Sequence, residues 1–382
     1  MIGNELFVTA FIADIHFGAQ KSENLYQQLQ DRFIKVIEKN KVDMIVFGGD
    51  LFHSIITMNY STSHYVLLFM ERVVEACKKN GIKYIRILQG TMSHDNNQLS
   101  NFNIYEGRID IDFKIIRTVY EENLLEGIHI LYVPEEYMVN QDEVYSYYLN
   151  RDKDYDFIFG HGMFKEVTFV ARNQESEVTM SKAPVFDSKQ FINACKGPIY
   201  FGHIHIRNSI KEHIHYPGSF SRWRFGEEDD KGWYLNIYNI KTHRYKHEFI
   251  KNTKAEKYVT ISALVVPNLK PEDLTATVNT VLHDAEHVKL KLIIKDDVDC
   301  AYTVSYLNNM YQNHPDVKLE VKNEFEFKRE AQIDKVVNEA MEKYGFLTDE
   351  SFTHEEKIQK FIKMKRGKDV PLDVINDILN LK

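Results

Sequence analysis

The stretch Met44-Ile45-Val46-Phe47-Gly48-Gly49-Asp50-Leu51-Phe52-His53 joins a short apolar run to two glycines and then to an aspartate. An apolar run of this length bounded by glycine is typical of a buried strand. Three other apolar runs, within 11–16, 157–161 and 199–205, are also followed by Asp or His. Because α/β sheets place ligands beyond the carboxyl ends of their strands, we expect six side chains to meet at one edge of one sheet: Asp14, His16, Asp50, His161, His203 and His205.

This set of Asp and His side chains has the composition of a two-metal phosphoesterase site. Two divalent ions about 3.5–4 Å apart can activate a nucleophile near neutral pH and neutralise the phosphoryl oxygens. Asp50, beside two glycines, is placed to bridge the ions, and Asp14 with His16 can turn toward one of them. Taken alone, each motif is also compatible with an ordinary core or loop residue. Their joint occurrence after four strand-like runs favours the metal site.

The composition predicts a soluble protein with more than one domain. The chain has 382 residues, 43% of them hydrophobic, and three widely spaced cysteines. That cysteine pattern excludes a disulfide framework and a cysteine zinc site, and it fits a reducing cytoplasm. The sequence shows no signal peptide and no apolar run that could span a bilayer. A net charge of −8 argues against broad adhesion to nucleic acid, but bound divalent ions would offset it locally.

The patterning divides the chain into three parts. Residues 1–255 alternate strand-like and helix-like segments, and we expect a two-sheet α/β/β/α sandwich with helices outside the sheets. Residues 256–328 read as a small β-α-β-α-β cap domain that restricts access to the site. Residues 329–382 read as a helical tail with two apolar stripes. Since short isolated helices are marginal in water, the tail either docks on the protein's own surface or binds a partner.

A fifth segment with candidate site residues is Gly90-Thr91-Met92-Ser93-His94-Asp95. With it, the order of the motifs resembles that of the calcineurin-like metallophosphoesterases. The resemblance covers roughly residues 10–205. The resemblance implies that the first ion binds Asp14, His16 and His205, that the second binds His161 and His203, and that Asp50 bridges them. It also implies that His94 acts near the leaving oxygen, with Asp95 orienting it. Ser93 stands where the family has an asparagine, so we expect Ser93 or water to complete a looser second site.

The continuation Gly49-Asp50-Leu51-Phe52-His53 resembles the SbcD-type recombination and repair nucleases, in which a histidine at this place helps to position the substrate. This resemblance implies two Mn²⁺ ions, with Mg²⁺, Fe²⁺ or Zn²⁺ as alternatives. It implies DNA as substrate, an SbcC-type coiled-coil ATPase bound by the tail, and a homodimer within a heterotetramer. The Ser-His-Asp variant is similar to versions encoded by large bacteriophages, which act in the cytoplasm of a bacterial host.

The segment Arg222-Trp223-Arg224 combines two guanidinium groups with an indole ring. It can contact DNA phosphates and stack on an unpaired base, or it can pack against the catalytic sheet. The expected function is that of a metal-dependent DNA nuclease, acting as exonuclease, endonuclease or both. Two alternatives remain open: a phosphatase or cyclic phosphodiesterase for small molecules, and a scaffold without activity that docks the ATPase.

Overall fold

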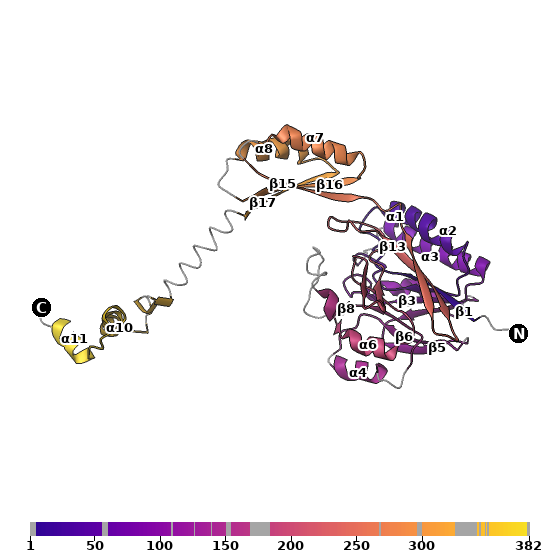
Figure 1. The fold of residues 1–382 in the computed structure, drawn as a ribbon, viewed down its shortest axis with the longest axis horizontal. Helices are drawn as coiled ribbons and strands as arrows, with labels where there is room; N and C mark the ends of the chain where they lie inside the picture. The colour runs from indigo at the N-terminus through magenta and orange to yellow at the C-terminus, as the bar shows by residue number, and fades with distance from the viewer. Residues whose placement is uncertain are drawn as a thin grey trace. The chain divides into compact units, whose positions relative to one another are not determined.

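The computed structural model describes residues 5–55, 60–107, 110–125, 127–138, 140–149, 154–168, 184–266, 269–295, 300–324, 342–343, 345–347, 349 and 351–379 (Figure 1). The chain forms two compact units. One contains residues 1–260 and 277–289, and the other contains residues 261–276 and 290–382.

The first of two six-stranded sheets carries the N-terminal half of the expected site. Its strand order is β14-β13-β1-β2-β3-β4, in which β1 to β4 are parallel and β13 and β14 are antiparallel. The four residues of β2 are all buried, as the apolar run predicts. The strands are β1 (Leu6–Ile12), β2 (Met44–Phe47), β3 (Tyr84–Leu88), β4 (Asp112–Ile116), β13 (Gly232–Asn239) and β14 (Tyr245–Lys251).

The second six-stranded sheet carries the remaining motifs. Its order is β11-β12-β10-β7-β6-β5, and its centre, β6, β7 and β10, is parallel. The strands are β5 (Tyr120–Asn123), β6 (His129–Val133), β7 (Phe157–His161), β10 (Ile199–Gly202), β11 (Asn208–Ile210) and β12 (Ile214–Tyr216). A further pair, β8 (Met163–Phe164) and β9 (Val185–Phe186), forms a short parallel sheet of its own.

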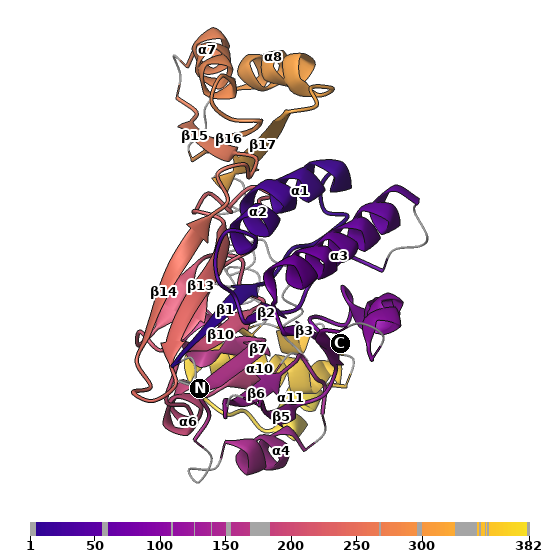
Figure 2. The ribbon, with the colours of Figure 1, turned by 90° about the vertical axis from the view of Figure 1, so that its right-hand side faces the viewer.

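Side-chain alternation along the strands builds a four-layer sandwich. In β1, Phe7 and Phe11 belong to the core between the two sheets, where Phe11 stacks on Phe159 of β7. Val8 and Ile12 point the other way, into the core beneath the helices. The helices lie outside the sheets (Figure 2): α1 (Ser22–Leu29), α2 (Lys35–Ile37) and α3 (Tyr60–Asn80) on the first, with the π-helical turn Gln30–Ile34 between α1 and α2, and α4 (Gln141–Tyr148) and α6 (Ser188–Ala194) on the second. The expected α/β/β/α fold class is confirmed.

The C-terminal part contains a small α/β element and, farther along the chain, helical segments. A three-stranded sheet has the order β15-β16-β17, and its elements follow one another as β-α-β-α-β. In the tail, a capping box begins α10 and Gly367, with a φ of 66°, ends it. These elements are β15 (Tyr258–Leu264), α7 (Pro271–Leu282), β16 (His287–Ile294), α8 (Ala301–Tyr311), β17 (Val317–Asn323), α10 (His354–Arg366) and α11 (Leu372–Leu379). Within the described ranges, no helix is both long and apolar enough to cross a bilayer.

A buried ion pair joins the two sheets of the sandwich. Arg86 of β3 is fully buried and donates from Nε and Nη2 to the two carboxylate oxygens of Glu122 in β5, at 2.9 and 2.8 Å. Nη2 also lies 3.0 Å from Asp112 Oδ2. Burial raises the pKa of Glu122, but its bonds to Arg86 outweigh that effect and hold this pKa below its ordinary value. The forked geometry makes this a strong charge-assisted contact.

We expect Glu122→Gln to destabilise the fold by about 3 kcal/mol, because it leaves the guanidinium of Arg86 buried without its main counter-charge. Asp112→Asn serves as the matched change, since the Asp112 side chain is 42% exposed and its loss can be compensated by water. The free energy of unfolding measured in urea distinguishes the two variants. Equal stability of Glu122→Gln and the wild type would show that the pair does not hold the sheets together.

Candidate metal centre

The six expected ligands come from both sheets of the sandwich. Asp14 and His16 follow β1 and Asp50 follows β2, all in the first sheet. His161 ends β7 in the second sheet, where His203 and His205 follow β10. The expectation of a single sheet edge is therefore wrong. The side chains still meet, because the two sheets pack face to face and their strand ends open at the same side.

Ring nitrogens and carboxylate oxygens lie within 4.8 Å of one another in three groups of side chains. Two of these groups are the ones expected for two ions: Asp14, His16 and His205 form one, and Asp50, His161 and His203 form the other. The third combines His16 with His53 and His94. This chain therefore has candidate ligands for two divalent ions.

In the first group, two imidazole rings approach each other through their Nε2 atoms. Nε2 of His16 lies 2.9 Å from Nε2 of His205, and Nδ1 of His205 lies 2.7 Å from a carboxylate oxygen of Glu227. Burial lowers the pKa of both imidazoles, which favours their neutral form. A neutral imidazole is the form that binds a metal ion, and a carboxylate on the opposite nitrogen fixes its tautomer and orientation.

In the second group, carboxylates face the histidines. Nε2 of His161 lies 3.3 Å from Oδ2 of Asp50, and its Nδ1 is held 2.7 Å from the carbonyl oxygen of Gly48. Burial lowers the pKa of His161, but the charge of Asp50 raises it well above its ordinary value. Glu135, which follows β6, is also fully buried, and its Oε2 lies 3.2 Å from Nδ1 of His203.

The donor atoms of this centre fit two divalent cations. Within the described residues, the buried nitrogens His16 Nδ1, His161 Nε2 and both ring nitrogens of His203 have no hydrogen-bond partner. Asp14 and Asp50 are 0% and 2% exposed. Since buried charges are normally paired or coordinate metals, and mixed imidazole and carboxylate ligands suit manganese, iron or zinc, the residues present match the group that the family implies.

The backbone at the strand ends adopts a conformation that residues other than glycine rarely adopt. The φ angles of Asp14, His16, Asp50 and His203 are 51°, 54°, 52° and 95°. Such left-handed residues cost on the order of 1–3 kcal/mol each and cluster at functional sites. At Gly90, a Cβ would lie 2.2 Å from Oδ1 of Asp50, so no side chain fits beside that carboxylate. The fold thus carries strain at the positions that present the donor atoms.

Asp95 supports the loop that carries Asp50. Its fully buried carboxylate accepts hydrogen bonds from the amides of Asp50, Leu51, Phe52 and Gly90, at 2.8–3.2 Å. Burial, together with the charge of Asp50, raises the pKa of Asp95 to about 7. His94, which the resemblance pairs with Asp95, instead directs its Nδ1 at the carbonyl oxygen of His53.

Aromatic and basic side chains line one flank of the first group. The rings of His94 and His53 lie 5.0 and 5.8 Å from that of His16, and Trp223 packs 4.7 Å from His53. The guanidinium of Arg224 lies over the ring of Trp223 at 4.4 Å. Four of the expected catalytic or DNA-contacting residues are thereby brought beside the expected ligands.

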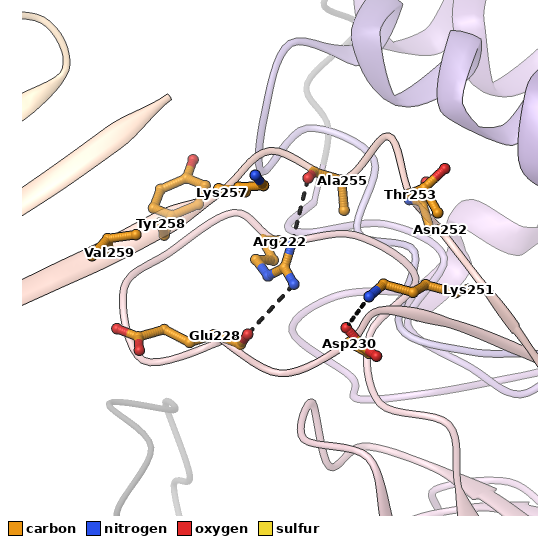
Figure 3. Close-up of a pocket in the computed structure, with 10 residues that line it drawn as sticks. All are labelled: Arg222, Glu228, Asp230, Lys251, Asn252, Thr253, Ala255, Lys257, Tyr258 and Val259. Atoms are coloured by element: carbon orange, nitrogen blue, oxygen red, sulfur yellow. Dashed lines mark hydrogen bonds and ion pairs between the residues drawn. The ribbon is translucent and has the colours of Figure 1, made fainter. Parts of the chain in front are cut away.

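Arg222 is placed differently from its neighbours. It is 9% exposed, and its guanidinium donates to main-chain carbonyl oxygens, among them those of Glu227 at 2.8 Å and Asp229 at 2.6 Å. Arg222 lines a pocket of about 500 Å³. Figure 3 shows its guanidinium directed at the backbone of Glu228 and Ala255. These bonds are those of a side chain that organises a loop.

Three residues at the site were not among those expected from the sequence. Glu135 follows the strand-like run 128–133 by two residues, so the rule that found the other carboxylates could have found it. Thr91 donates from its amide to Asp50 Oδ1 at 2.6 Å, whereas Ser93 is exposed. Glu227 lies in a loop without any motif, and nothing in the sequence pattern indicates its contact with His205.

The family model described as calcineurin-like phosphoesterase matches residues 7–243. This chain therefore belongs to the calcineurin-like phosphoesterase family, which implies metal-dependent hydrolysis of phosphoesters. It is 25% identical over 303 residues to "Putative phosphoesterase 244L" of Invertebrate iridescent virus 6, covering 76% of this chain and 94% of that protein. A solved dimetal phosphatase from Danio rerio is similar over 64% of this chain and 99% of its own, at 8% identity and a TM-score of 0.35.

We expect Glu227→Gln to weaken divalent-metal binding at the first group about 10- to 100-fold, because the carboxylate that orients His205 is lost. The neighbouring variant Glu228→Gln, at an exposed side chain, should bind the metal as the wild type does. Calorimetric titration of the metal-free protein with Mn²⁺ measures both. Identical titrations for the two variants would contradict the positioning role of Glu227.

Proposed function

We propose that this protein is a divalent-metal-dependent DNA nuclease subunit that hydrolyses phosphodiesters by a two-metal mechanism. The observation that carries the proposal is the packing of His53 and Trp223 beside His16 and His94. A ring next to the reacting phosphate offers a stacking surface to a base, and stacking on aromatic rings is a general way to hold single-stranded nucleic acid. The continuation of the Asp50 motif through His53 supports the same substrate.

The residues of the chain would act on the substrate in distinct ways. Asp14, His16, His205 and Asp50 would hold one ion, and His161, His203 and Asp50 the other, with Mn²⁺ as the proposed metal. When bound, these ions supply an activated water and neutralise the phosphoryl oxygens. His94, held through its Nδ1 by the carbonyl oxygen of His53, would donate a proton to the leaving oxygen. Arg224 and Trp223 would contact the strand that carries the scissile bond.

We expect His94→Ala to lower the cleavage of linear duplex DNA in the presence of Mn²⁺ about a hundredfold or more, because general acid catalysis contributes about 10²–10⁴. Asp50→Ala should lower it at least as much, because it removes the carboxylate that both ions would share. Ser93→Ala, at an exposed position, should change the rate little. Removal of metal with EDTA should abolish activity, and added Mn²⁺ should restore it.

The same assay separates the proposal from its alternatives. Turnover of nucleotides or p-nitrophenyl phosphate without any cleavage of DNA would indicate a small-molecule phosphatase or cyclic phosphodiesterase. Equal activity of Asp50→Ala, His94→Ala and the wild type would exclude catalysis by this site. If the wild type also bound no divalent ion, a scaffold without activity would be the better description.

We further propose that the tail binds an SbcC-type coiled-coil ATPase, that the nuclease acts as a homodimer within a heterotetramer, and that it works in the bacterial cytoplasm. Helices α10 and α11 contact each other, with Gln359 Nε2 donating to the carbonyl oxygen of Val370 at 2.6 Å. Among the described residues of these helices, Phe361 and Ile378 remain 38% and 63% exposed. Exposed apolar side chains on short helices are consistent with cover by a partner.

Co-expression with the cognate coiled-coil ATPase tests this partner. We expect Ile378→Asp to abolish copurification, because a carboxylate would be buried in the interface. Lys368→Asp introduces the same group at an exposed polar position and should leave the complex intact. Retention of the ATPase by both variants would contradict the proposed role of the tail.

A further inference from the structure

Glu135 lies beside the second group of expected ligands. It lies two residues beyond β6, after Val133 and Pro134, and it is 0% exposed. Its Oε2 lies 3.2 Å from Nδ1 of His203 and 3.7 Å from Nε2 of His161. The carboxylate thus faces the two imidazoles that would bind the second ion.

The two oxygens of this carboxylate have different surroundings. Oε1 accepts a hydrogen bond from the hydroxyl of Tyr137 at 2.6 Å. Oε2 faces the histidines, and the hydroxyl of Thr91 lies 3.3 Å from it and 3.3 Å from Oδ2 of Asp50. Tyr137 thus fixes Oε1, and Oε2 is directed toward the site, as a single-oxygen metal ligand would be.

An independent observation points to a ligand between these groups. Among the described residues, Nε2 of His161 and Nε2 of His203 are buried without a hydrogen-bond partner. Since Nδ1 of His161 is engaged with the carbonyl oxygen of Gly48, its Nε2 is left to present a lone pair to a cation. The carboxylate of Glu135, added to Asp50, His161 and His203, gives a donor set for a divalent ion such as Mn²⁺, Fe²⁺ or Zn²⁺.

We infer that Glu135 is a ligand of the second metal ion in this chain, in which the residue at the family's asparagine position, Ser93, is exposed. This inference rests on the two-metal function proposed above. Each ion then has one carboxylate of its own, two imidazoles and the shared Asp50. The additional negative charge makes the second site tighter, instead of the looser site that a serine ligand implies.

The test compares metal binding by metal-free full-length variants. We expect the wild type to bind two Mn²⁺ ions in calorimetric titration. Glu135→Gln, nearly equal in volume, should bind the second ion at least tenfold more weakly, and Tyr137→Phe should weaken it less, since the carboxylate remains. Ser93→Ala is the matched control and should bind both ions as the wild type does. Electron paramagnetic resonance should show coupled Mn²⁺ pairs in the wild type and in Ser93→Ala, and their loss in Glu135→Gln.

The outcomes separate this inference from the proposed function. Two ions bound by Glu135→Gln with unchanged affinity, or loss of the second ion in Ser93→Ala alone, would overturn the role of Glu135 and leave the nuclease proposal standing. Normal metal binding by the wild type without cleavage of DNA would contradict the nuclease and leave the ligand assignment standing. No binding by the wild type would overturn both. Every variant should unfold cooperatively in EDTA from a state with the circular dichroism spectrum of the wild type, so that a change in binding is not a failure to fold.

Discussion

The burial of several carboxylates at one point is the constraint on which the rest of this structure depends. Asp14, Asp50 and Glu135 are at most 2% exposed, and each lies among histidines rather than lysines or arginines. Buried anions without fixed positive partners are costly. Protonation of His161, whose pKa Asp50 raises despite burial, offsets part of that cost. Divalent ions would offset it more fully, because they carry more charge and accept lone pairs from the same imidazoles.

The fold supports this concentration of charge with backbone rather than with side-chain cations. Asp95 gathers the amides of the loop after β2, and the amide of His203 donates to both oxygens of Asp14, at 2.9 and 3.0 Å. The left-handed φ angles at Asp14 and Asp50 are held by this surrounding hydrogen bonding. Backbone strain of this kind persists only where the surrounding packing fixes the strained conformation. The two well-packed sheets directly behind the site provide that packing.

Sequence patterns predicted the parts of this arrangement that depend on local order along the chain. Strand 84–88, the α/β/β/α class and the approach of Asp50 to His161 all follow from apolar runs and the residues after them. The pattern could not show that two sheets share the site, because strand pairing is a long-range property. The contact between Glu227 and His205 was missed for the same reason, since it joins two loops. Glu135 was missed although it obeys the strand-end rule.

The charge of the chain limits how the proposed nuclease could hold DNA. A net charge of −8 gives no general attraction to a polyanion, and Arg222, one of the arginines near the centre, is already bound to main-chain carbonyl oxygens. Arg224 remains beside Trp223, but it also lies 3.1 Å from the carboxylate of Glu227. Both arginines thus already have partners within the protein. A DNA substrate would have to gain its affinity from the bound metal ions, from stacking on Trp223, and from a partner that supplies the extended basic surface. This dependence is the physical reason to expect that such a nuclease works as a subunit of a larger assembly.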